Sequence, residues 1–301
     1  MLKLQIPFIM PDIDLLVSAV LFLIMLGIGI SLSIKEVKTV YCKPKALLVS
    51  LCSQMILLPL LAFIIAFVFD IPAYIKIGLV ILASSPGGTT SGFITYLFKG
   101  NVALSLTLTT LNSILVVFSI PLIVNFAIEH FEGNEKSFFL PFFYIVKEIG
   151  MLTAIPISIG ILFKKLHKDL SLKLSKLLKP VMIVLLGIVF LLKFIGAEGK
   201  NGITGSEIME ILPFALLLNI LCLLTGYSVS KLFSLDTRDC ITISIESAVH
   251  NTTMAFLLSG TLLHNSDYGK VSLVYALFSF WTAIAFSYFV KKYDSNNVEA
   301  D

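Results

Sequence analysis

The chain carries a carboxylate at a place where water cannot solvate it. Glu246 lies inside the apolar stretch 240–263, which contains no Lys or Arg. An ionised carboxylate at membrane depth is unfavourable unless it is paired. Its partner must therefore come from another helix or be a bound cation.

Oxygen groups that could hold such a cation occur in several apolar stretches. Hard cations such as Na+ take oxygen ligands, and the candidate groups are the carboxylate of Glu246, the hydroxyls of Ser91, Ser105 and Thr109, the amide of Gln54, and the main-chain carbonyls of 247–250. Ser105, Thr109 and Asn112 follow one another at spacings of four and three residues, so they share one helical face. A polar face in an apolar span either serves helix packing or turns toward the protein interior.

Two apolar stretches are interrupted by polar sequence, at Ser84–Ser91 and at Glu246–Asn251. Pro86 lacks a backbone donor, so one half-helix is expected to end after Ala83 and another to begin near Thr90. Broken helices persist at membrane depth only where they line a protein cavity or bind a ligand. One break in each half of the chain predicts a transporter built from inverted repeats, with its site where the breaks meet.

Three other polar residues lie near these breaks. His250 is either a hydrogen-bonded packing residue or, because imidazole titrates near neutral pH, a proton carrier. Gln54 and Asn219 occupy matching positions in the apolar stretches that precede the two breaks. That symmetry favours a functional role for both amides.

Composition places the chain in a membrane. It has 301 residues, of which 57% are hydrophobic and 14% charged, and its mean hydropathy is +0.97. A helix of about 20 residues crosses the hydrocarbon layer, and the segments that can do so are 15–34, 45–69, 73–98, 102–128, 138–163, 177–197, 207–230, 240–263 and 271–290. We therefore predict an all-α polytopic membrane protein with about nine transmembrane helices.

Lys and Arg gather in alternate loops, after the odd-numbered segments, whereas the opposite loops carry mainly Asp and Glu. Cytoplasmic loops accumulate Lys and Arg, so the pattern predicts an N-terminus outside and a C-terminus in the cytoplasm. The net charge of +3 is thus a topology signal and does not indicate nucleic-acid binding. No cleavable signal peptide is evident, and the short loops suit a bacterial inner membrane.

The four cysteines predict neither a disulfide framework nor a metal site. None lies in an outer loop of this topology, and no Cys/His spacing suits a metal. We interpret them as small apolar fillers. No cofactor is expected other than sodium as the coupling ion.

The residues around both breaks resemble the bile acid sodium symporter family. The matching motifs are Pro86-Gly87-Gly88-Thr89 through Tyr96, Gly100-Asn101-Val102-Ala103-Leu104-Ser105 with Thr109, Ile245-Glu246 with Asn251, and Leu277-Phe278-Ser279 with Trp281. The resemblance implies inverted repeats with two crossing discontinuous helices. It implies a single transporter domain over 1–301, made of a core (45–128 and 207–290), a panel (15–34 and 138–197) and a cytoplasmic tail (291–301).

The resemblance also implies ligand sets. The family's first sodium site corresponds to Ser91, Ser105, Thr109 and Glu246. Its second corresponds to Gln54, Glu246, the backbone carbonyls of Ser247 and Val249, and His250. Two positions depart from the family pattern, because Gly92 stands where an Asn is usual and His250 where a Gln is usual. The positions implied for substrate are Thr89, Thr90, Asn251 and Thr282.

We therefore expect a secondary active transporter that moves a small organic anion, bile acid-like or a smaller carboxylate, inward with Na+ by alternating access. Two Na+ against Glu246 leave about one positive charge, which a monovalent anion would neutralise. With a single ion, a neutral or zwitterionic cargo is also open. The expected partners are the anion, Na+ and the lipid bilayer, with no nucleic acid and no obligate protein partner.

Three alternatives follow from the same residues. A proton-coupled transporter would use His250 and Glu246. An intramembrane hydrolase would use Ser91 and His250, but the sequence supplies no oriented third member for such a site. A channel would need rings of pore-lining charge, and these are absent from the sequence. We therefore do not expect an enzyme.

Overall fold

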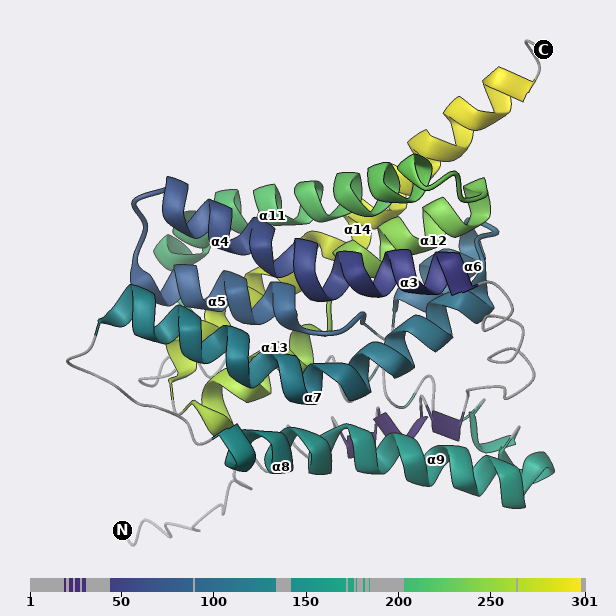
Figure 1. Cartoon of the computed structure of the whole chain (residues 1–301), viewed down its shortest axis with the longest axis horizontal. Helices are drawn as coiled ribbons and strands as arrows, with labels where there is room; N and C mark the ends of the chain where they lie inside the picture. Colours follow the sequence, from purple (N-terminus) through teal and green to yellow (C-terminus); the bar gives the residue numbers. More distant parts are fainter. Residues whose placement is uncertain are drawn as a thin grey trace, which may run out of the picture.

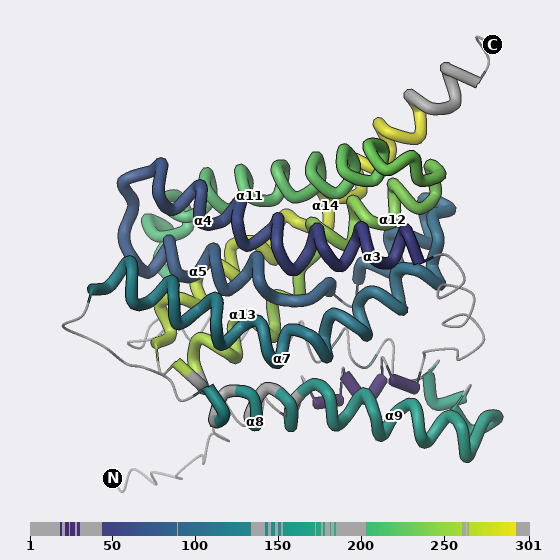
Figure 2. Tube along the Cα trace, viewed as in Figure 1, coloured from purple at the N-terminus to yellow at the C-terminus, as the bar shows by residue number. Residues whose placement is uncertain are grey.

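A computed structural model of the chain describes residues 44–88, 90–133, 142–171, 203–263 and 265–298, together with single positions within 19–30 and 173–184. The described residues form a bundle of helices (Figures 1 and 2) and contain no strand. The predicted all-α class is therefore confirmed. The expected segments 15–34 and 177–197 lie mostly outside the described residues.

The helices follow the apolar stretches of the sequence, with interruptions inside several of them. In chain order they are α3 (Pro44–Cys52), η1 (Ser53–Leu57), α4 (Leu58–Val68), α5 (Ala73–Ser84), α6 (Ser91–Leu97), α7 (Val102–Glu132), α8 (Phe142–Leu152), α9 (Ala154–Leu166), α11 (Gly205–Leu232), α12 (Thr237–Ala248), α13 (Thr252–Leu257), η4 (Leu258–Leu262) and α14 (Ser266–Val298).

Within the part of the chain that the structure describes, four helical stretches are long and apolar enough to cross a membrane: Pro44–Val68, Val102–Glu132, Gly205–Leu232 and Ser266–Lys292. α5 and α12 are shorter, with 12 residues each, because the polar breaks end them. The chain is thus a multi-pass membrane protein. The number of nine spans and the division into core and panel stay predictions.

α5 lies at the centre of the bundle. Every residue from Ile77 to Ser84 is buried, so protein surrounds this part of the helix on all sides. α5 packs against α4, α7 and α14, and Figure 1 shows it between α4 and α7. The first break is therefore held in a fully packed environment.

The stretch that contains Gln54 is not a regular α-helix. Residues Ser53–Leu57 form one π turn, in which the N–H of Leu58 donates to the carbonyl of Ser53. Pro59 follows directly and cannot donate to the turn before it. π turns of this kind widen a helix and often occur at functional sites, and this one buries both Ser53 and Gln54.

α8 and α9 form a separate layer along the α7 side of the bundle, away from α11 (Figure 1). The first apolar segment crosses α9 at two glycines. A Cβ on Gly160 would lie 2.7 Å from the N of Ile30, and a Cβ on Gly29 would overlap the carbonyl of Ile157. Small residues allow helix backbones to approach this closely in a membrane.

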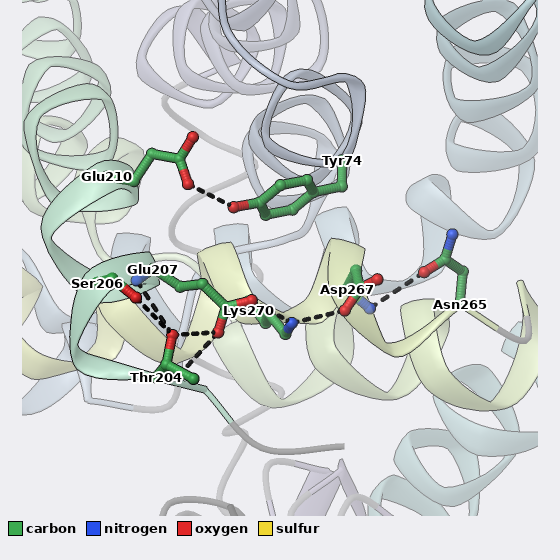
Figure 3. Close-up of polar contacts among 8 residues, drawn as sticks. All are labelled: Tyr74, Thr204, Ser206, Glu207, Glu210, Asn265, Asp267 and Lys270. Atoms are coloured by element: carbon green, nitrogen blue, oxygen red, sulfur yellow. Dashed lines mark hydrogen bonds and ion pairs between the residues drawn. The ribbon is translucent and has the colours of Figure 1, made fainter. Parts of the chain in front are cut away.

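A polar cluster joins the first turns of α5, α11 and α14 (Figure 3). Lys270 contacts Glu207 at 2.7 Å and Asp267 at 2.6 Å. The hydroxyl of Tyr74 donates to Glu210 over 3.0 Å. These contacts tie the same end of three helices together, one from the first half of the chain and two from the second.

The glycine crossing predicts a stability effect. Gly160→Ala should lower the free energy of unfolding by about 1–3 kcal/mol, the usual effect of overpacking, because the new methyl group meets backbone atoms of the first segment. Gly150→Ala on α8 is the matched control, since its Cβ would find only Val117 Cγ1 at 3.8 Å. Thermal unfolding in detergent measures both, and equal effects would contradict the proposed close crossing.

Candidate functional site

The first break begins where Pro86 prevents α5 from continuing. Ser85, which precedes it, has φ −74° and ψ 149°, the extended conformation that a following proline imposes. α5 ends at Ser84 and α6 begins at Ser91. The end of α5 and the start of α6 each lie within one residue of the positions predicted from the sequence, Ala83 and Thr90.

The second break separates α12 from α13. α12 ends at Ala248, and Val249 leaves the helical conformation with φ −97° and ψ 81°. Asn251 then starts α13, because its side-chain oxygen accepts a hydrogen bond from the N–H of Met254 over 3.0 Å. Three residues between the helices are therefore free to pair with another segment.

Their partner is the first break. The N–H of Gly88 donates to the carbonyl of Val249 over 2.5 Å, and the N–H of Asn251 donates to the carbonyl of Pro86 over 2.8 Å. Gly87 and His250 form an antiparallel bridge between these two bonds. The two interruptions thus satisfy each other's backbone groups, which lipid could not do.

Glu246 lies beside this pairing and is almost fully buried, with 1% of its surface exposed. Ser91 Oγ and Ser105 Oγ both donate to its Oε1. Thr109 Oγ1 donates to its Oε2 over 2.9 Å. α6 and α7 therefore supply three hydroxyls to one carboxylate of α12. Thr109 lies one turn from Ser105 on the predicted polar face of α7.

This arrangement of side chains can hold a hard cation. It contains only oxygen ligands and a single negative charge, and each hydroxyl can rotate to turn a lone pair toward a cation. Ser91 Oγ already has a second acceptor, the carbonyl of Gly88 at 2.7 Å. It could therefore keep its proton on that carbonyl while its lone pair faces a cation near Glu246.

The other residues implied for sodium are not gathered around Glu246 in the same way. Gln54 accepts a hydrogen bond from Asn112 Nδ2 over 2.7 Å and donates to Ser50 Oγ over 3.3 Å. The carbonyl of Val249 accepts from Gly88. The hydroxyl of Ser247 is buried without a hydrogen-bond partner among the described residues.

His250 takes part in a different group of contacts. Its Nδ1 lies 3.4 Å from the carbonyl of Ser85, and its Nε2 lies 3.8 Å from Cys222 Sγ. The single proton of the Ser91 hydroxyl, in contrast, has two acceptors within reach, Glu246 Oε1 and the carbonyl of Gly88. The serine and histidine of the hydrolase hypothesis thus bond to different partners.

The residues implied for substrate are spread over three elements. Thr90 is half-buried at the start of α6, and Asn251 caps α13. Thr282 Oγ1 donates to carbonyls of its own helix, α14, at Phe278 and Ser279. Thr89 lies outside the described residues. A shared substrate site for them stays a prediction.

Sequence reasoning missed two contacts at the end of α12. The carbonyl of Ala248 accepts from Tyr275 Oη over 2.6 Å and from Asn219 Nδ2 over 3.2 Å. The symmetry of the two halves identifies Asn219 as a candidate functional residue. Nothing in the sequence identifies Tyr275, because a tyrosine in an apolar span is usually a packing residue. Cys222, interpreted as a filler, contacts His250.

Comparison with known proteins identifies relatives of the chain. A family model described as the sodium bile acid symporter family matches residues 18–200. An uncharacterized sodium-dependent transporter of Bacillus subtilis, YocS, is 29% identical over 88% of this chain and 78% of its own length. The human hepatic sodium/bile acid cotransporter is 26% identical over 80% of this chain and 69% of its own.

A plant relative is longer. A probable sodium/metabolite cotransporter of Arabidopsis thaliana chloroplasts, BASS1, is 27% identical over 78% of this chain but only 56% of its own length. The chain therefore spans about half the length of several relatives that it matches. The family and the relatives named here are transporters, so the expectation that the chain is not an enzyme is confirmed.

The packing of the carboxylate predicts that a side chain at Gly87 would be destabilising. A Cβ there would overlap Glu246 Oε2 and lie 3.3 Å from Thr109 Oγ1. Gly87→Ala should therefore displace the carboxylate and lower the unfolding free energy by about 1–3 kcal/mol. Gly92→Ala is the control, because its Cβ would make only ordinary contacts, at 3.5 Å and 3.6 Å. Thermal unfolding should separate the two, and a tolerated Gly87→Ala would contradict the packing.

Proposed function

Because this chain belongs to the sodium bile acid symporter family, we propose that it is a secondary active transporter that couples inward movement of a small organic anion to Na+. The observation that carries the proposal is the buried carboxylate of Glu246, surrounded by hydroxyls from two other helices. A carboxylate in this position needs a positive partner. In the family to which the chain belongs, sodium is the natural candidate.

We assign the cation to Glu246, Ser91, Ser105 and Thr109. Binding there would connect α6, α7 and α12 through one ion. Ser91 and Glu246 lie in the helices that start or end at the two breaks, so the same ion would fix the geometry of the paired breaks. The proposed coupling is that Na+ organises this region and thereby favours cargo binding, which by linkage makes cargo favour Na+.

The cargo is proposed from the relatives and from charge. Their names point to bile acids and to metabolites as cargoes of those proteins, and a small carboxylate would suit a site beside a bound cation. Thr90, Asn251, Thr89 and Thr282 are the proposed contacts. The buried Nδ2 of Asn251 has no hydrogen-bond partner among the described residues, so it could donate to a carboxylate.

Alternating access is proposed to move one group of helices against another. The pairing of the breaks ties α5, α6, α12 and α13 into one unit. α9 instead contacts the first apolar segment through glycines. These two groups correspond to the proposed core and panel, in a membrane topology with the N-terminus outside and the C-terminus inside, in a bacterial inner membrane.

The decisive test is sodium-specific stabilisation of the purified protein. A ligand at a hundred times its Kd raises the unfolding free energy by about 2.7 kcal/mol. We expect a higher Tm in NaCl than in KCl or choline chloride at equal ionic strength. Ser105→Ala and Glu246→Gln should each remove most of this difference, because they delete a ligand or the charge.

Ser113→Ala is the matched control for Ser105→Ala. Ser113 lies two turns further along the same face of α7, is fully buried, and donates only to the carbonyl of Thr109 over 2.6 Å. Its loss should leave the sodium effect intact. Equal Tm values in the three salts would reject sodium binding.

The proton-coupled alternative predicts a different result in a transport assay. Uptake driven by an acid-outside gradient without sodium, and lost in His250→Gln, would support it.

A further inference from the structure

A second buried carboxylate, Asp239, lies two helical turns before Glu246 on the same side of α12. Only 3% of the surface of Asp239 is exposed, and its Oδ1 accepts a hydrogen bond from Asn101 Nδ2 over 2.7 Å. Its place in the first turn of α12 puts the negative charge at the positive end of the helix dipole. Burying a charge is unfavourable unless the surroundings compensate it, so this contact between α7 and α12 is a specific one.

Asn101 holds the start of α7 against the start of α12. Its Oδ1 accepts from the N–H of Leu104 over 3.1 Å and so caps α7, while its Nδ2 donates to Asp239. Its backbone N–H donates to Thr242 Oγ1 over 2.8 Å. That hydroxyl directs its own proton to the carbonyl of Arg238 over 2.7 Å. The side chain and the backbone of one residue therefore connect the two helices in a single geometry.

The same turn also fixes α6. The N–H of Gly100 donates to the carbonyl of Thr95 over 2.8 Å, which closes the end of α6, and α7 begins two residues later. A Cβ on Gly100 would lie 2.7 Å from Thr242 Oγ1, so the backbone of the turn rests directly on α12. α6 carries Ser91 at its start. Both helices that supply hydroxyls to Glu246 are thus anchored on α12 at one point.

This anchor is in register with the hydroxyl contacts of the carboxylate. Ser105 lies four residues after Asn101 on α7, and Glu246 lies four residues after Thr242 on α12. Four residues of α-helix rise about 6 Å, so the anchor bond at Thr242 and the hydroxyl bond at Glu246 lie one turn apart on both helices. A shift of α7 along α12 would therefore move the Ser105 hydroxyl away from the carboxylate.

We propose that Asn101 and Asp239 are positioning residues, which set the register of α7 against α12 and thereby hold the hydroxyls at the separation from Glu246 that binds Na+. The inference rests on the sodium site assigned above. The pair does not contact the ion. It limits how far the ligands can separate, and the size and flexibility of such a group of oxygens determine how well a cation is held.

Equilibrium binding of radioactive sodium to the purified full-length protein, together with the Tm in choline chloride, tests this role. Asn101→Ala should lower the Tm and raise the Kd for Na+ roughly tenfold, as does the loss of groups that orient metal ligands. Thr204→Ala is the matched control, because Thr204 caps α11 at the end remote from α12. It should lower the Tm in the same way and leave the Kd unchanged.

An exchange of the two side chains separates positioning from stability. Asn101→Asp alone places two carboxylates together, so it should weaken Na+ binding at least as much as Asn101→Ala. Adding Asp239→Asn reverses the direction of the bond. The carboxylate at position 101 can still accept from the N–H of Leu104, and the amide at position 239 can donate to it. The Kd of the double variant should therefore return to near that of the wild type.

Thr242 provides a second test that introduces no charge. Thr242→Val nearly keeps the volume of the side chain and removes the acceptor of the Asn101 N–H, so it should raise the Kd, whereas Thr242→Ser keeps the oxygen and should not. An unchanged Kd in Asn101→Ala and Thr242→Val, or no recovery in the double variant, would overturn the positioning role and leave the proposed function intact. No sodium binding to the wild type would overturn both.

Discussion

The structure depends on one electrostatic constraint, a buried carboxylate that has no basic residue bonded to it among the residues that the structure describes. The three hydroxyls that donate to Glu246 come from α6 and α7, so solvating this charge requires helices from the two halves of the chain to meet. Water cannot replace these donors at such depth. The positions of the first break and of the polar face of α7 therefore follow from the need to supply oxygen and hydroxyl groups at one point.

The pairing of the breaks solves a second problem created by the first. Ending α5 and α12 beside the carboxylate leaves peptide groups unpaired, and each would cost several kcal/mol in lipid. The breaks satisfy one another through two backbone hydrogen bonds. This contact is possible only where no side chain intervenes, because a Cβ on Gly88 would lie 2.8 Å from the carbonyl of His250. The absence of a side chain at Gly87 and Gly88 thus allows the backbones of the two breaks to approach each other closely.

Features that depend on local sequence could be predicted, and so could the meeting of the two breaks, whereas most other contacts between helices could not. Proline and paired glycines located the first break to within one residue, and the spacing of Ser105 and Thr109 placed both on the face that contacts Glu246. The π turn at Ser53–Leu57 was not predicted; in it the N–H of Leu58 donates to the carbonyl of Ser53, directly before Pro59, which has no N–H. The contacts of Cys222 and Tyr275 were missed because they join distant segments and involve residues common in apolar packing.

The two sides of the paired breaks differ in how far their hydrogen bonds can rearrange when a ligand binds. On the side of Glu246, hydroxyls rotate at little cost, so their protons and lone pairs can be rearranged when a cation enters. On the side of His250, the side chains of Asn219 and Tyr275 both donate to the carbonyl of Ala248. In the proposed mechanism, ion binding would change the order of the first side and leave the hydrogen bonds of the second in place. A transporter needs such a difference, since an ion shifts an equilibrium only by binding one state better than the other.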